Sequence, residues 1–151
     1  MLKAALDGPM RDRPVLIVRA ALCLSIIISG LALRGIGPDL GLPLLLVKYG
    51  GSLLWDAMVF FLVAIAAPRL SWRRIALISA SIAVAVELFR LVHAPSLDAF
   101  RMTLAGALLL GRIFSPWNLL AYGAGIVFGV LLDRWAIRAF TRTGRAPHTS
   151  R

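Results

Sequence analysis

The chain has 151 residues, of which 60% are apolar and only 16% are charged. An average soluble domain has about 25% charged residues, so the composition excludes an ordinary soluble domain, and the high apolar content excludes a disordered chain. The formal net charge is +10. In an apolar chain this excess of arginine and lysine is typical of cytoplasmic segments of a membrane protein rather than of a nucleic-acid-binding protein. The composition therefore predicts a single integral-membrane domain over residues 1–151.

Four apolar segments are long enough to cross a bilayer as helices, because about 20 residues span the hydrocarbon core. Pro14 suits the first position of the first helix, and Ser115 followed by Pro116 is a typical start for the last one. Arg19 lies near the start of the first segment, where we expect its side chain to extend toward the headgroups. The predicted fold is an all-α bundle of four transmembrane helices, at about residues 14–33, 51–67, 75–92 and 116–132.

A shorter apolar segment, residues 97–110, favours a re-entrant or interfacial helix between the third and fourth spans. The polar and basic tail, residues 141–151, is predicted to be disordered. Eleven arginine and lysine residues lie on the side that holds the N-terminus, the second connection and the tail, against five on the opposite side. The excess of basic residues on cytoplasmic segments then places both termini in the cytoplasm.

Polar residues in and beside the predicted spans reach similar depths near the outer end of the bundle. Asp56, Glu87 and Tyr122 each lie about six residues, or roughly 9 Å, from that end of a span. Glu87 shares a helix face with alanines, which allow close packing and direct that face into protein. Ionisable residues inside spans are costly and usually functional. We therefore predict one outward-facing ligand-binding cluster of Lys48, Asp56, Glu87, Arg90, His93, Asp98, Arg101, Asn118 and Tyr122.

The same residues also have purely structural interpretations. Glu87 and Arg90 would form a buried pair that fixes helix packing. Asp98 and Arg101 are three residues apart and would brace a short helix. Cys23 is expected to be a small buried hydrophobe. Because the sequence carries no metal-ligand set and no nucleophile motif, we predict neither a metal nor a cofactor, assign no catalytic residue and favour a non-catalytic role.

Short motifs spread from the first outward connection to the last span form a distinctive set. They are Lys48-Tyr49-Gly50, Leu54-Trp55, Met58-Val59, Glu87, HAPSLDAFR at 93–101, LLLGRIF at 108–114, Trp117, LLAY at 119–122 and Gly125. Together they resemble an uncharacterised bacterial membrane family, the domain of unknown function DUF2809, over about residues 15–132. More distantly, the layout is similar to VanZ-like proteins, which are linked to teicoplanin resistance. The resemblance implies a multi-pass protein of the bacterial cytoplasmic (inner) membrane.

Several functions stay open on these observations. The leading hypothesis is a non-catalytic envelope protein that binds an anionic or glycosylated lipid headgroup at the outer leaflet, because basic groups pair with phosphate and carboxylates accept hydrogen bonds from sugar hydroxyls. The alternatives are a small assembly partner of another membrane protein, a proton-coupled transporter with Asp56 and Glu87 as relays, and a lipid-modifying enzyme with Glu87 as its base. The expected partners are a membrane lipid, a lipid-linked glycan, a second copy of the chain or another membrane protein, and no nucleic acid.

Overall fold

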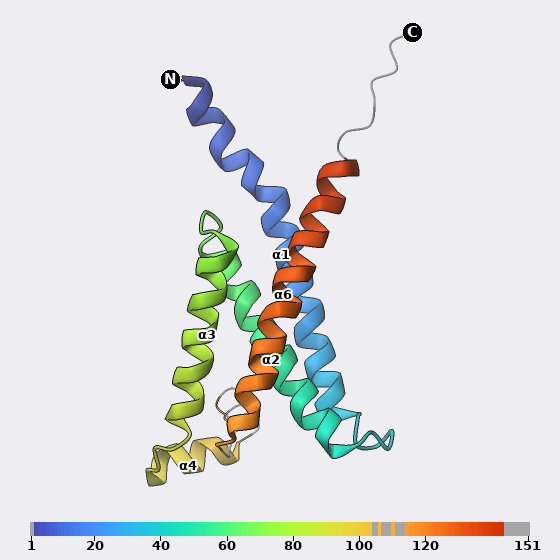
Figure 1. The fold of residues 1–151 in the computed structure, drawn as a ribbon, viewed down its shortest axis with the longest axis vertical. Coiled ribbons are helices and arrows are strands. Elements are labelled where there is room, and N and C mark those ends of the chain that lie inside the picture. Colours follow the sequence, from blue (N-terminus) through green and yellow to red (C-terminus); the bar gives the residue numbers. More distant parts are fainter. Residues whose placement is uncertain (1, 104–105, 107–109, 111–113, 144–151) are drawn as a thin grey trace.

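A computed structural model describes residues 2–103, 106, 110 and 114–143, and all the regular secondary structure in this part of the chain is helical. The long helices run in alternating directions, so the start of α1, the connection between α2 and α3, and the end of α6 lie at one end of the molecule (Figure 1). The short helix α4 lies across the opposite end (Figure 1). The helices are α1 (Leu2–Gly35), α2 (Leu44–Ala66), α3 (Trp72–Phe89), α4 (Pro95–Met102) and α6 (Pro116–Thr143).

Three of these helices are long and apolar enough to cross a membrane, namely α1 over Arg13–Gly35, α2 over Leu44–Ala66 and α6 over Pro116–Phe140. The prediction of an all-helical membrane fold is therefore confirmed at this level. The helix α3 is 18 residues long and carries charged residues at both ends, with two arginines in its first turn and Glu87 near its last. It is not apolar enough to be counted with these three helices, so the span predicted at 75–92, the third in chain order, stays a prediction.

The helix boundaries differ from the predicted spans at several ends. The helix α1 begins at Leu2, so Pro14 lies inside it rather than at its first position. A proline removes one backbone hydrogen bond but does not prevent helix on both sides. The helix α3 ends at Phe89, before residue 92, and α6 continues to Thr143. The first residues of the tail predicted to be disordered are thus helical, whereas residues 144–151 lie outside the described part.

The helix predicted at 97–110 is shorter and begins earlier, because α4 covers only Pro95–Met102. Thr103 ends it in an extended conformation. Its hydroxyl donates a hydrogen bond to the carbonyl oxygen of Phe100 at 2.7 Å and accepts one from the N–H of Gly106 at 3.1 Å. A threonine that bonds to nearby backbone groups in this way competes with continuation of the helix. Most of the remaining predicted residues, 104–105 and 107–109, lie outside the described part.

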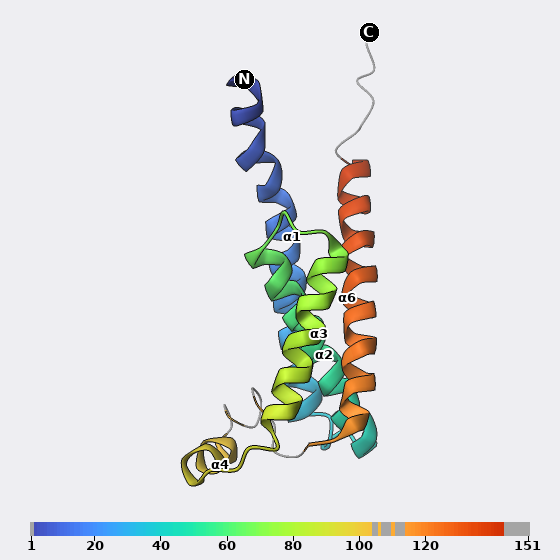
Figure 2. The ribbon, with the colours of Figure 1, turned by 60° about the vertical axis from the view of Figure 1, so that its left-hand side comes forward.

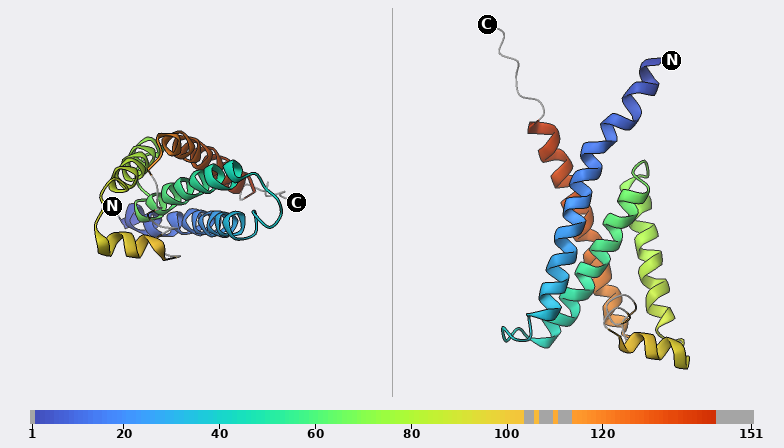
Figure 3. Two further views of the ribbon diagram at one scale, coloured as in Figure 1. Left: turned by 90° about the horizontal axis from the view of Figure 1, so that it is seen from below. Right: turned by 180° about the vertical axis from the view of Figure 1, so that it is seen from behind.

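The helix α2 is the centre of the packing. It contacts α1 on one side and α3 and α6 on the other, as the end-on view shows (Figure 3). The helix α3 lies beside α6 (Figure 2) but makes no contact with α1 within the described residues. The core holds Cys23, as predicted, and its buried residues are Cys23, Ile26, Ala57, Phe60, Phe61, Ala64 and Ile75.

Glycines set how closely α1 and α6 approach α2. Gly50 and Gly51 do not break α2, which begins at Leu44 rather than at residue 51. They lie where α1 packs, and a Cβ atom on Gly51 would be only 2.6 Å from Nε of Arg34. On the other side, a Cβ atom on Gly125 would collide with the carbonyl oxygen of Leu53. Gly129 also lies at this contact and faces the ring of Phe60.

A buried ion pair joins three helices at the end of the bundle that holds the chain termini. Arg19 is 7% exposed, so the prediction that it extends outward is wrong. Its Nε and Nη2 atoms donate to the Asp133 carboxylate at 2.8 and 3.0 Å, and Nη1 donates to the carbonyl oxygen of Ala64 at 2.9 Å. A bidentate pair with a third hydrogen bond satisfies the guanidinium inside the bundle, so α1, α2 and α6 are tied together there.

Replacing Gly125 by alanine is expected to destabilise the protein by about 1–3 kcal/mol, because the added methyl group overpacks the contact between α2 and α6. Gly123 is the matched control, since a Cβ atom there has no neighbour within 4 Å. Gly123→Ala should be neutral or slightly stabilising, by up to about 1 kcal/mol, through helix propensity. Thermal unfolding in detergent measures both, and equal stability of the two variants would contradict the close approach at Gly125.

Candidate functional site

The carboxylate of Glu87 accepts four hydrogen bonds. Glu87 lies near the end of α3 and is 1% exposed. Oε1 accepts hydrogen bonds from the backbone N–H of Ser115 at 2.7 Å and from Nδ2 of Asn118 at 3.3 Å. Oε2 accepts from the hydroxyl of Tyr122 at 3.0 Å and from Nη1 of Arg90 at 2.5 Å. One carboxylate thus joins the end of α3 to the segment before α6 and to α6 itself.

The arginines near Glu87 complete this end of the fold by binding backbone carbonyl groups. Nε of Arg90 donates to the carbonyl oxygen of Leu110 at 2.6 Å. Arg101, on α4, is buried and donates to the carbonyl oxygens of Phe89 and Val92 at 2.7 and 2.8 Å. These carbonyls lie at and just beyond the end of α3, where helix geometry leaves acceptors without partners. Arg101 therefore caps α3 and fixes α4 against it.

Hydrogen bonds and ion pairs gather most of the predicted cluster into two groups. The first is the set around Glu87, with Arg90, Asn118 and Tyr122. In the second, the Asp98 carboxylate, itself 45% exposed, lies 3.1 Å from Nη1 of Arg101 and 3.4 Å from Nδ1 of His93. Lys48 is exposed on α2, with its Nζ atom 5.1 Å from the ring centroid of Tyr49. The structure therefore does not place Lys48 in either group.

Asp56 lies apart from both groups, at the crossing of α2 and α6. It is 0% exposed, and neither carboxyl oxygen has a hydrogen-bond partner in the described part of the chain. Its Cβ atom packs against Gly125. A buried polar group without a hydrogen bond costs free energy, and ionisable residues inside spans usually have functional roles. Asp56 is thus a functional candidate in its own right.

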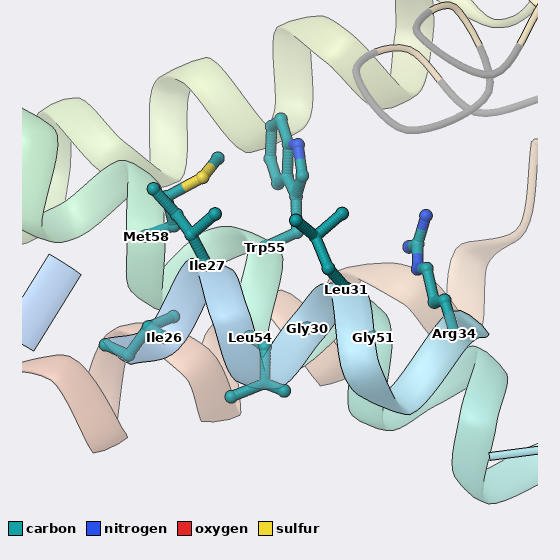
Figure 4. A pocket seen from close by; sticks show the side chains of 9 residues that line it. All are labelled: Ile26, Ile27, Gly30, Leu31, Arg34, Gly51, Leu54, Trp55 and Met58. Atoms are coloured by element: carbon teal, nitrogen blue, oxygen red, sulfur yellow. The ribbon is translucent and has the colours of Figure 1, made fainter. Parts of the chain in front are cut away.

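A groove between α1 and α2 was missed by the sequence analysis. Its walls are apolar along most of its length, and Arg34 lies at one end, with Ile26 and Met58 at the other (Figure 4). The guanidinium lies over Gly51. It has neither an ion pair nor a hydrogen-bond partner among the described residues. The lining residues are Ile26, Ile27, Gly30, Leu31, Arg34, Gly51, Leu54, Trp55 and Met58.

The fold and these sites define a helical membrane protein whose buried charges join its helices. The sequence profile described as "Protein of unknown function (DUF2809)" matches residues 42–126, which is more than half of the chain. The chain therefore belongs to the DUF2809 family, as the resemblance of its motifs predicts. All nine predicted site residues lie within the matched segment, whereas Arg19, Arg34 and Asp133 lie outside it. No curated protein and no solved structure matches the chain.

Replacing Glu87 by glutamine is expected to lower the stability by about 3 kcal/mol, because the buried Arg90 guanidinium loses its counter-charge. The amide also presents a donor where the carboxylate accepts hydrogen bonds. Asp39→Asn is the control, since Asp39 is exposed on the connection between α1 and α2, and it should change stability by no more than about 0.5 kcal/mol. Thermal unfolding in detergent compares them. A Glu87→Gln variant as stable as the wild type would refute the structural role of this carboxylate.

Proposed function

We propose that this chain is a four-span protein of the bacterial cytoplasmic membrane, with both termini in the cytoplasm, that binds an anionic lipid without transforming it. The lipid would occupy the groove between α1 and α2, with its headgroup at Arg34 in the outer leaflet. The observation that carries this proposal is a guanidinium at the end of an apolar groove, without a counter-ion among the described residues.

The arrangement of α3 supports its assignment as a span, the third of four in chain order. Its 18 residues give a length of about 27 Å, close to the roughly 30 Å of the hydrocarbon core. It runs beside α6 in the opposite direction (Figure 2). Its charged residues lie near its two ends, where side chains reach headgroups or pair inside the protein. The excess of arginine at the end that holds the start of α1 and the end of α6 supports a cytoplasmic position for that end.

The groove supports a lipid as the ligand because its polarity changes along its length. Ile26 and Arg34 are eight residues apart on α1, or about 12 Å. Arg34 is the residue before the last of the apolar stretch Arg13–Gly35, which supports a position of its guanidinium at headgroup depth. Apolar side chains then line the groove toward the bilayer centre. An acyl chain fits the apolar part, and a phosphate oxygen pairs well with a guanidinium.

The hydrogen bonds and the burial of Glu87, the residue that the enzyme alternative uses as its base, support a non-catalytic role. A general base must come within hydrogen-bond reach of the proton that it abstracts. The Glu87 oxygens already accept hydrogen bonds from four donors, and the residue is buried. We therefore assign Glu87 to the framework and Arg34 to the ligand.

The variant Arg34→Gln should retain about tenfold less lipid than the wild type, since a charge-assisted hydrogen bond is lost. Native mass spectrometry of protein extracted gently from its own membranes measures the retained lipid. Lys48 carries the same charge at the same end of the bundle but does not line the groove. The Lys48→Gln variant should therefore keep its lipid. Loss in Lys48→Gln with retention in Arg34→Gln, or a wild-type protein free of lipid, would contradict the proposal.

A second candidate function, proton-coupled transport, is favoured by one observation. Asp56 is buried within a span and has no hydrogen-bond partner in the described part of the chain. This candidate predicts that wild-type proteoliposomes with an internal pH dye dissipate a pH gradient and that Asp56→Asn abolishes the flux. The substitution is nearly isosteric, so folding should be preserved. Equal rates of pH-gradient dissipation for wild type, Asp56→Asn and protein-free liposomes would contradict this candidate and indicate a structural role for Asp56.

A further inference from the structure

Two arginines from different helices meet at one tryptophan near the end of the bundle that holds the chain termini. The guanidinium carbon of Arg73, on α3, lies 5.4 Å from the ring centroid of Trp72, and that of Arg134, on α6, lies 5.6 Å from it. A cation within about 6 Å of an indole centroid is attracted to the ring. Both guanidinium groups therefore lie within about 6 Å of the same ring, so that two positive charges adjoin one indole, although like charges repel.

These charges have no counter-ion among the described side chains, which are those of residues 13–103, 106, 110 and 114–140. No ion pair there involves Arg73, Arg74 or Arg134. The acid next to Arg134 in the sequence, Asp133, is buried in its bidentate pair with Arg19. An anion from outside the chain would relieve the repulsion within this group, and the three arginines are exposed to meet one.

The surroundings of this group are those of a membrane surface. Trp72 is 41% exposed and Trp135 is 68% exposed, and exposed tryptophans are typical of the headgroup region. A shallow depression on α6 brings Arg134 together with Trp135 and Leu131. Leu131 lies one turn nearer the bilayer centre than Arg134. The cationic Arg134 and the apolar Leu131 thus follow each other along α6 in the same order as the headgroup and the acyl chains of a phospholipid.

We infer that Arg73 and Arg134, held by Trp72, form a second binding site that takes the phosphate of an anionic diacyl phospholipid in the leaflet at the end of the bundle that holds the chain termini. The site is at the opposite end of the bundle from Arg34 and does not depend on the function proposed for the groove. Each of the two arginines of this site is expected to contribute about a fivefold preference through a charge-assisted hydrogen bond to the phosphate.

The test uses the full chain carrying Arg34→Gln, so that the groove does not contribute. The purified protein is placed in micelles with equal amounts of dioleoyl phosphatidylglycerol and dioleoyl phosphatidylcholine, and the bound lipids are counted by native mass spectrometry. Phosphatidylglycerol should predominate. Arg73→Gln and Arg134→Gln should each lower the ratio of the two lipids about fivefold.

Two controls keep the inference open to refutation. Arg13→Gln removes an exposed arginine at the same end of the molecule and should change the ratio less than twofold. Arg134→Lys keeps the charge and should retain most of the preference. An unchanged ratio in the Arg73→Gln, Arg134→Gln double variant, or an equal loss in Arg13→Gln, would overturn the site. Complete displacement of phosphatidylglycerol by inorganic phosphate would overturn its assignment to a lipid.

Discussion

The packing of the helices at the α4 end of the bundle depends on the hydrogen bonds that one buried carboxylate accepts. Glu87 is the one acidic residue of α3, and its oxygens draw Arg90, the backbone at Ser115 and two side chains of α6 to one point. A buried ion that loses a partner costs several kcal/mol, so α3 cannot slide along α6 without a large penalty. Arg101 then bonds to the end of α3, and the position of α4 follows from that of Glu87.

The groove follows from the central position of α2. Glycines let α1 and α6 approach α2 from two sides, while α3 packs against α2 and α6 without reaching α1. The face of α2 between α1 and α3 is therefore left uncovered by the described helices. Gly51 has a particular role, because the space that its missing side chain leaves is filled by the guanidinium of Arg34. The glycines that allow tight packing also position the guanidinium of Arg34.

The sequence predicts the parts of this fold that are set by local quantities. Apolar length locates the helices, and equal depth in neighbouring spans predicts that Glu87 and Tyr122 meet. The pair of Arg19 with Asp133 could not be found in this way, since Asp133 lies one residue beyond the predicted end of its span and the helix continues past it. Arg34 was also missed, because its position over Gly51 depends on the register between two helices, which hydropathy does not encode.

The pair of Arg19 with Asp133 has a consequence for biosynthesis. Its two residues are 114 positions apart in the chain, so a ribosome adding 5–20 residues per second makes Asp133 about 6–23 s after Arg19. During that interval Arg19 is without its carboxylate partner, and the ion pair that joins α1 to α6 cannot form until α6 has been made. Release of an incomplete chain before Asp133 would leave this charge exposed to the lipid, and quality-control proteases would have a defined feature to detect.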